Sequence, residues 1–459
     1  MIRAQKTFLA ITVFLLSSFI LSCTFTDNSN YNEQNQETAE DTPLDTTDTT
    51  EALPESTIEV FNPSINELKE TNIPIVEITT DDESNIDSKD IWKEANLKIN
   101  GEFCGESDFY TEELQIKGRG NSSWGQPKKS YSLKLSDKEK ILGMPKSKRW
   151  VLIANYSDKT LLRNLYASYL GNNIYKTTWN PSFKSVHLIL NGDYKGVYLL
   201  GEQIKIDDKR VNIKDITKAD NIEDGGFIIE VNARLDEAFN FTTTRGVPIS
   251  LKDPDEVSTE IQDNVRKIIQ TAEDTLYSDG FDDTENGWRK MIDENSVIDW
   301  YIVNEFTKNN DAIFFSSVYI YYNSKDHKLH FGPNWDFDIS CGNINYNGCD
   351  NPENFWIKNA RWISRMFEDP HFVNNLKQRW NLTKAELYDS ITNWLPSQAA
   401  TLQVSSNMNF QKWQILGKYV WPNASGYENR TTYQSEVDYM IQWLKCRYDY
   451  LDNEFSKIE

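Results

Sequence analysis

Three aspartates near the middle of the chain have the type and spacing needed for metal and phosphate chemistry. Asp311 follows a predicted helix, and Asp336 and Asp338 follow a predicted antiparallel hairpin with strands at 316–322 and 328–332. Because a hairpin brings its two ends together, we expect the three carboxylates to converge. Such a group favours a hard divalent cation, most simply Mg²⁺, which prefers carboxylate oxygens and bound phosphate. A calcium site or an acidic turn with satisfied hydrogen bonds is the alternative.

The order of these parts is the one that protein kinases use: a helix, a catalytic aspartate, a short hairpin and a metal-binding aspartate. Farther upstream, the glycine-containing loop, residues 118–124 (Gly-Arg-Gly-Asn-Ser-Ser-Trp), links two predicted strands. Its small residues would let backbone N–H groups approach a phosphate. The two features together favour kinase-like chemistry, although the loop alone is also typical of an ordinary turn.

Basic residues and one glutamate follow this loop. Lys128, Lys129 and Lys134 lie on or beside the next predicted strand, where one of them could reach nucleotide phosphates. Glu202 ends an apolar run, and a buried glutamate needs a cationic partner. The functional interpretation is a Lys–Glu or Arg–Glu pair that fixes a phosphate-binding cation, and the alternative is a purely structural ion pair.

The elements that must position these residues change in kind along the chain. Period-two alternation, apolar runs and an Asn-Gly turn at Asn191 predict strands at 114–117, 131–135, 150–154, 186–190, 196–206 and 226–231. Predicted helices span 157–170, with Ser157 as N-cap and Gly171 as stop, then 258–278, 283–293, 296–309 and most of 352–459. This pattern predicts an α+β protein with a β-rich N-terminal lobe, a mainly helical C-terminal lobe and a cleft between them.

The N-terminus is typical of an exported, lipid-anchored protein. Arg3 and Lys6 precede an apolar run at 8–20, and Ser22-Cys23 follows. This pattern resembles the bacterial lipoprotein signal, so we expect a signal peptide at 1–22, a lipidated Cys23, and a location on the extracytoplasmic face of the cell membrane. Residues 23–56 are acidic and polar, which predicts a disordered linker. A cleaved signal peptide with a chance cysteine is the alternative.

Composition narrows the other possibilities. The 459 residues carry a formal net charge of −22. This charge argues against nucleic acid as a partner, because proteins that bind nucleic acid need clustered cations.

Four cysteines remain after Cys23, and we predict a disulfide between Cys341 and Cys349, with free thiols as the alternative. Most of the seven tryptophans after residue 350 should belong to the core, whereas three or more on one exposed face would favour a binding protein.

Several ordered motifs together resemble the spore-coat CotH kinase family. They are residues 117–124 with 127–131, 150–155 with Asp158 and Arg163, 196–203, and 332–338. The resemblance covers about 75–385 of a domain predicted at 57–459, which leaves a helical C-terminal extension. Members of this family with established activity are secreted, atypical protein kinases related in fold to protein kinases.

The resemblance implies a two-lobed kinase-like fold that transfers the γ-phosphate of Mg-ATP to Ser or Thr of a surface or coat protein. Asp311 would be the catalytic aspartate, and Asp336, with Asp338, would hold the metal. The nucleotide-side residues would be Arg119, Asn121, Lys129, Lys134 and Glu202.

One departure from the family pattern lies between these aspartates. Where some members have an Asn a few residues after the catalytic Asp, this chain has Ser316 and Ser317, so one metal ligand is weaker or missing, and Asp338 could compensate for it. The contrasting interpretation of the whole chain is a catalytically silent surface lipoprotein that binds protein or polysaccharide.

Overall fold

Seven strands of the N-terminal half close into a barrel. In the computed structural model, which describes residues 61–457, the barrel order is β1-β2-β3-β4-β5-β7-β6, and β1 closes it by pairing in parallel with β6. The strands are β1 (Ile75–Thr80), β2 (Lys93–Asn100), β3 (Phe109–Arg119), β4 (Ser130–Ile141), β5 (Met144–Ile153), β6 (Phe183–Leu190) and β7 (Asp193–Glu202). The predicted signal peptide, Cys23 and the linker to residue 56 lie outside the described residues.

The barrel is built by alternation along each strand. On β4, Leu133 and Leu135 are buried in the barrel core, whereas Ser130 and Ser132 point to the outer face. The turn between β6 and β7 is the predicted Asn-Gly turn, with φ of 51° at Asn191 and 76° at Gly192. Positive φ at both positions is what a two-residue type I′ turn requires, so this hairpin prediction is confirmed.

A second sheet of five strands follows the barrel. Its order is β12-β11-β8-β10-β9, formed by β8 (Phe227–Val231), β9 (Asn240–Thr242), β10 (Pro248–Asp253), β11 (Val318–Asn323) and β12 (Lys328–Phe331). The β11–β12 hairpin predicted from the sequence is present, with Asn323 opposite Lys328.

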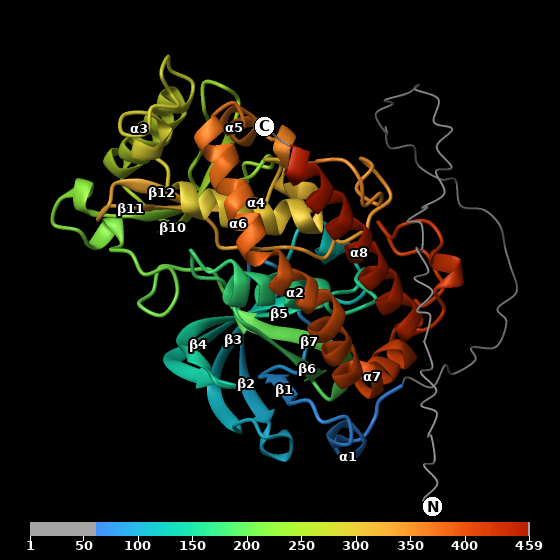
Figure 1. Ribbon diagram of the computed structural model, residues 1–459. Coiled ribbons are helices and arrows are strands. Elements are labelled where there is room, and N and C mark those ends of the chain that lie inside the picture. The colour runs from blue at the N-terminus through green and yellow to red at the C-terminus, as the bar shows by residue number, and fades with distance from the viewer. Residues whose placement is uncertain (1–60, 458–459) are drawn as a thin grey trace, which may run out of the picture. The chain divides into compact units, whose positions relative to one another are not determined.

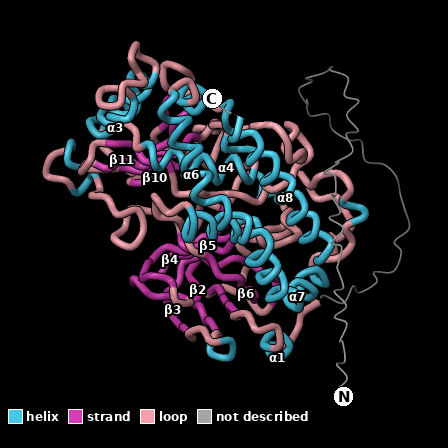
Figure 2. Tube along the Cα trace, viewed as in Figure 1, coloured by secondary structure: helices cyan, strands magenta, loops and turns pink. Residues whose placement is uncertain are grey.

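Helices make up most of the rest of the chain. They are α1 (Ile65–Lys69), α2 (Arg163–Tyr169), α3 (Thr259–Leu276), α4 (Glu294–Thr307), α5 (Arg361–Met366), α6 (Pro370–Asp389), α7 (Leu395–Lys412) and α8 (Tyr433–Lys457). In Figure 1 the barrel strands gather at one end, with α7 beside them, and α4, α6 and α8 lie toward the other end. Figure 2 shows the same division between strands and helices. The predicted α+β class is confirmed in this form, and the relation to the protein kinase fold stays a prediction.

Helix α4 is the centre of the C-terminal region. Every residue from Ser296 to Thr307 is buried, and Asp293 caps the first turn by accepting a hydrogen bond from the Ser296 N–H at 2.8 Å. Its Glu305 pairs with Arg447 of α8 at 2.6 Å, with both side chains fully buried. This helix therefore fixes the start of the segment that carries Asp311.

Three helix predictions were wrong in detail. Helix α2 begins at Arg163 rather than after Ser157, because Asp158 accepts hydrogen bonds from the Thr160 and Arg163 N–H groups and holds a turn there. Gly171 does not stop it, since a π turn continues to Ile174. The helix expected at 283–293 is replaced by a loop, in which a Cβ at Gly287 would lie 2.0 Å from the Phe281 carbonyl oxygen. Residues 413–432 are also mostly loop.

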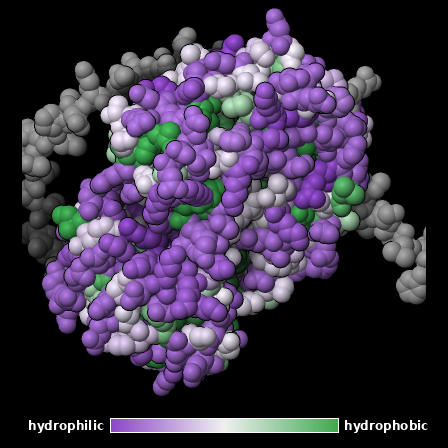
Figure 3. Space-filling model, turned by 90° about the vertical axis from the view of Figure 1, so that its left-hand side faces the viewer, coloured by the Kyte–Doolittle hydropathy of each residue, from purple (hydrophilic) through white to green (hydrophobic). Residues whose placement is uncertain are grey.

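The tryptophan expectation is confirmed. Among the seven tryptophans after residue 350, Trp362, Trp380 and Trp443 are fully buried and Trp421 is the exposed one. Figure 3 shows a face of the molecule that is mainly hydrophilic, with hydrophobic residues in small separate patches. Within the described residues, no helix is both long enough and apolar enough to cross a membrane.

Candidate active site

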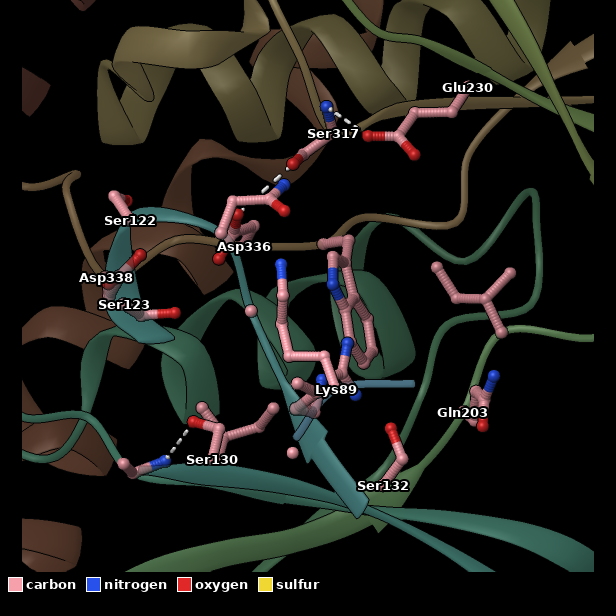
Figure 4. A pocket seen from close by; sticks show the side chains of 18 of the residues that line it. Lys89, Ser122, Ser123, Ser130, Ser132, Gln203, Glu230, Ser317, Asp336 and Asp338 are labelled. Atoms are coloured by element: carbon pink, nitrogen blue, oxygen red, sulfur yellow. Dashed lines mark hydrogen bonds between the residues drawn. The ribbon is translucent and has the colours of Figure 1, made fainter. Parts of the chain in front are cut away.

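A cleft of about 760 Å³ lies between the outer face of the barrel and the second sheet. We call the lining residues from Lys89 to Ile153 the barrel wall, and those from Glu230 to Ile339 the opposite wall. The glycine-containing loop contributes its residues 118–123 to the barrel wall, and Ser130 and Ser132 of β4 lie beside it. Figure 4 shows Asp336, Asp338 and Ser317 on one side of this cleft, with Lys89 pointing into it.

The three aspartates of the central motif all line this cleft. Each of the two serines that replace the expected Asn bonds one aspartate: Ser316 Oγ donates to Asp311 Oδ2 at 3.0 Å, and Ser317 Oγ donates to Asp336 Oδ2 at 3.1 Å. The serines therefore orient two carboxylates and do not simply leave a gap in the motif.

The carboxylates crowd one another. Asp336 keeps a surface open to the cleft, but protein encloses it on its other sides, and this burial, followed by the charge of Asp311, raises its pKa. Burial, then Asp336, Asp158 and Asp311, raises the pKa of Asp338 well above its ordinary value. The group therefore carries more negative charge than its surroundings neutralise, and a bound cation would relieve this repulsion.

The backbone at the site adopts an uncommon conformation. Ser317 and Asp336 both have positive φ, 60° and 65°, which costs energy for residues other than glycine. The Ser317 N–H donates to Glu230 Oε1 at 2.9 Å, and Lys252 Nζ lies 3.2 Å from Glu230 Oε2. Lys252 also pairs with Glu237. A network from β10 through β8 thus holds Ser317 where it reaches Asp336.

Arg119 is a cation on the barrel wall whose charge acts on this group. Its guanidinium lies 5.2 Å from the Trp335 ring centroid, and its charge lowers the pKa of Asp336, against the larger effects of burial and Asp311. Its buried Nη1 atom has no hydrogen-bond partner within the described residues. A buried N–H donor without an acceptor is costly, and a phosphate oxygen would satisfy it.

Other predicted nucleotide-side residues are placed differently. Asn121 lines the cleft, whereas Lys129, Lys134 and Glu202 do not. Lys129 donates to the Trp124 carbonyl oxygen, and Lys134 lies two residues beyond Ser132 on the same outer face of β4. These lysines are therefore close to the cleft without facing it.

The buried Glu202 has an arginine partner, but neither residue of this pair lines the cleft. Arg210 Nε lies 3.5 Å from Glu202 Oε1, and Arg210 donates to the Arg149 carbonyl oxygen at 2.8 Å. Lys128 is also buried elsewhere and donates to Asn409 Oδ1 of α7 at 2.9 Å. The structural interpretation therefore fits both residues.

Sequence reasoning missed an ion pair that faces the cleft, Glu230 with Lys252. Glu230 and Lys252 lie on β8 and β10 of the second sheet, and Lys89 comes from the loop before β2. The only sequence signal was alternation on β10, where the apolar Ile249 and Leu251 are buried and Lys252 falls on the other face. Nothing in the spacing connects Lys252 to Glu230, because the two strands pair only after folding.

The two walls are joined at one end by a buried pair. Arg163 Nη1 lies 2.5 Å from Asp158 Oδ1, in the segment after β5. The same guanidinium donates to the carbonyl oxygens of Ser340 and Cys341 at 2.9 and 3.2 Å. The loop that carries Asp338 is therefore fastened to the barrel side of the cleft.

The predicted disulfide between Cys341 and Cys349 is wrong, since both residues are free thiols. Cys341 is buried beside Ser340 Oγ at 3.4 Å, and Cys349 Sγ lies 3.9 Å from the Asn347 carbonyl oxygen. Hydrogen bonds hold the intervening loop instead, including one from Lys308 Nζ to the Gly348 carbonyl oxygen at 2.9 Å.

The residues present suit a Mg²⁺ ion that arrives with its substrate. Among the described residues, no group of three or more Asp, Glu, His or Cys side chains is arranged to hold a metal by itself. Kinase Mg²⁺ ions rest on one or two carboxylates plus phosphate oxygens and water. The crowded pair of Asp336 and Asp338 supplies hard oxygen donors of this kind, so the donor set fits.

Comparison with known proteins agrees with this geometry. The profile of the family described as CotH kinase protein matches residues 116–451, a range that holds the glycine-containing loop and all three aspartates. This match extends beyond residue 385, where the predicted resemblance ended, into the C-terminal helices. A search of curated proteins finds no match. A match over this much of the chain shows that it belongs to the CotH kinase family.

Proposed function

We propose that this protein is a Mg-ATP-dependent protein kinase that phosphorylates Ser or Thr hydroxyls of a surface or coat protein. The observation that carries the proposal is the cleft in which three carboxylates of the family motif face Arg119 and the glycine-containing loop. Two facing walls around one polar cleft also support a kinase-like, two-lobed arrangement, although the N-terminal lobe is a closed barrel.

In this proposal the barrel wall binds the nucleotide. Arg119 offers an unpartnered N–H group to a phosphate oxygen, and Asn121 and the backbone of the glycine-containing loop lie beside it. Lys89 lines the same cleft and has no ion-pair partner among the residues that the structure describes. These groups can bind and orient a triphosphate without first breaking a salt bridge.

The opposite wall performs the transfer. Asp336 and Asp338 would hold Mg²⁺, which when bound neutralises charge on the phosphate oxygens. Asp311, held by Ser316, orients the acceptor hydroxyl and takes its proton as the oxygen forms its bond to the γ-phosphorus. The bond from that phosphorus to the β,γ-bridging oxygen breaks, and ADP leaves.

Two isosteric variants test these roles by calorimetry and phosphate transfer on the full chain in detergent. Asp336→Asn should lose Mg²⁺-dependent ATP affinity, because the charge that holds the metal is gone. Asp311→Asn should bind Mg-ATP normally and transfer phosphate at least roughly 100-fold more slowly, the scale of a lost general base. Asp282→Asn, at an exposed aspartate outside the cleft, is the matched control.

The competing interpretation, a catalytically silent surface protein, predicts a flat titration of the wild type with Mg-ATP. In that case the two cleft variants would change thermal stability alone. A flat wild-type titration would overturn the proposed function before any variant is made.

We also propose that the chain is anchored by lipid at Cys23 on the extracytoplasmic face of a bacterial membrane. The Ser22-Cys23 pair after an apolar run supports this location. Cys23→Ser should move the protein from the membrane to the soluble fraction, because a short apolar run alone does not span a bilayer. A variant that still sediments with membranes would contradict the anchor.

A further inference from the structure

We propose that an aromatic platform at the mouth of the cleft, formed by Tyr346, Tyr419 and Trp421, binds carbohydrate rings. Trp421 and Tyr419 are 47% and 45% exposed, although large aromatic side chains normally belong to the core of this protein. Tyr346 and Trp421 lie nearly parallel, with an interplanar angle of 16° and 6.2 Å between ring centroids. Tyr346 and Trp421 therefore form a stacked pair, and the exposed parts of Trp421 and Tyr419 leave aromatic surface accessible to a ligand.

The platform is held rigidly by buried carboxamides. Asn423 Nδ2 donates to the Ser157 carbonyl oxygen and to Asn343 Oδ1, both at 2.8 Å. Asn343 Nδ2 in turn donates to the Asp338 carbonyl oxygen at 2.8 Å. These bonds fix the segment that carries Trp421 to the segments that carry Ser157 and Asp338, so the exposed ring is held beside the cleft.

The platform is continuous with the candidate active site. Trp421 lines the cleft together with Asp338. Next to Tyr346, Asn347 Nδ2 donates to Asn310 Oδ1 at 2.9 Å, and Asn310 Nδ2 donates to Asp311 Oδ1 at 2.8 Å. A ligand on the platform would therefore lie at the entrance that leads to Asp311.

Neutral polar groups accompany the rings and supply the hydrogen-bond partners that a sugar needs. Asn345 Nδ2 donates to the Tyr419 hydroxyl at 3.0 Å, and the Asn345 and Asn347 side chains are exposed. Carboxamides both donate and accept hydrogen bonds, as sugar hydroxyls require. The C–H face of a pyranose carries partial positive charge and packs on the electron-rich face of an aromatic ring.

A peptide ligand fits this surface less well. Extended peptides add to an open strand edge, or place side chains in apolar pockets. Residues 342–354 and 413–432, which carry the platform, contain no strand. We therefore assign the platform to a saccharide chain, and this binding goes beyond the proposed function because it requires neither ATP nor phosphate transfer.

Saturation-transfer NMR on the full chain in detergent, with cellohexaose, chitohexaose and laminarihexaose as probes, tests the assignment. At least one hexasaccharide should bind, and Trp421→Ala should weaken that binding about 3- to 10-fold, the scale of one lost aromatic stacking contact. Trp421→Phe should retain part of it. Tyr110→Ala, at a 59% exposed tyrosine on β3, should leave it unchanged.

Three outcomes would overturn the assignment. One is no transfer to any hexasaccharide at millimolar concentration, and another is equal binding by wild type and Trp421→Ala. The third is binding of a Ser/Thr-rich peptide alone that Trp421→Ala abolishes, which would make the platform a peptide site. A flat Mg-ATP titration would leave all three readouts intact, so the two proposals fail separately.

Discussion

The two walls of the cleft differ sharply in charge. The barrel wall contributes four cations, Lys89, Lys117, Arg119 and Arg149, and one acid, Asp90. The opposite wall contributes eight acids, Glu230, Asp236, Glu237, Asp253, Asp255, Asp311, Asp336 and Asp338, and two cations, Arg234 and Lys252. A triphosphate with bound cations is complementary to such a pair of surfaces, since its anionic side suits one wall and its metal side the other.

The walls also differ in how they are built. The barrel wall is the outer face of a closed sheet, where alternation alone decides which residues face the cleft. The opposite wall depends on buried charged side chains and on residues in the left-handed backbone conformation, such as Ser317 and Asp336. Changes to the opposite wall and its support should therefore cost more stability than changes to the barrel wall.

The largest effect is expected for Arg447→Met, behind the opposite wall. Glu305 would then be buried without its cation, and the free energy of unfolding should fall by about 3–5 kcal/mol. Urea unfolding measures this change. Arg266→Gln, which breaks an exposed pair with Asp263, should cost less than about 1 kcal/mol. Equal losses in both variants would show that burial does not determine how much the Glu305–Arg447 pair contributes to stability.

Next in size is Arg119→Met on the barrel wall. Losing a charged hydrogen bond to phosphate should weaken Mg-ATP binding roughly 10- to 100-fold. The free energy of unfolding should not fall, because the variant removes a buried donor that has no partner within the described residues. Calorimetric titration and urea unfolding of the same sample separate the two effects. Unchanged ATP affinity would remove Arg119 from the site.

A pH effect sharpens the comparison further. His187 lies in the barrel between Thr71 Oγ1 at 2.7 Å and the Tyr194 hydroxyl at 2.9 Å, and burial lowers its pKa to about 3. Below about pH 6.5 the unfolded chain binds a proton that the folded chain does not. Stability should therefore fall by about 1.4 kcal/mol per pH unit from this residue as pH drops toward 3.

His187→Gln should remove this part of the pH dependence, as measured by urea unfolding between pH 4 and 7. Asp336 and Asp338, with raised pKa values, contribute in the opposite direction, because their repulsion disappears on protonation. Parallel pH profiles of wild type and His187→Gln would show that the barrel histidine does not titrate on unfolding.

The smallest effect is expected for Lys129→Met. Its side chain lies outside the cleft, so ATP affinity should change by less than about twofold, within the range of ordinary surface substitutions. Calorimetric titration beside Arg119→Met makes the comparison. A loss as large as that of Arg119→Met would mean that Lys129 turns into the cleft when nucleotide binds.

Local patterns predicted much of the fold. Alternation gave the strands around Leu133, and the Asn191-Gly192 turn gave a hairpin, because both signals act over a few residues. Closure of the barrel was not predictable, since it depends on the parallel pairing of Ile75 with His187, more than a hundred positions apart. The helix expected at 283–293 failed because a close backbone approach at Gly287 overrides propensity.

The candidate site divides in the same way. The predicted hairpin alone was enough to predict that Asp311, Asp336 and Asp338 lie close together. Arg119 belongs to a glycine-containing loop that can be recognised in the sequence. The partnership of Glu230 and Lys252 arises only when β8 and β10 pair, so no spacing reveals it. The disulfide between Cys341 and Cys349 was inferred from proximity in sequence, which says nothing about where two thiols point.

The buried Arg163 pair has a consequence for motion. It ties the segment after β5 to the loop after Asp338. Separating the two segments would leave a buried charged group without its partners, at a cost of several kcal/mol. Any opening of the cleft should therefore keep these two segments together and move other parts of its walls. The aromatic platform, whose neighbour Asn423 donates to the Ser157 carbonyl oxygen next to Asp158, should keep its place during such an opening.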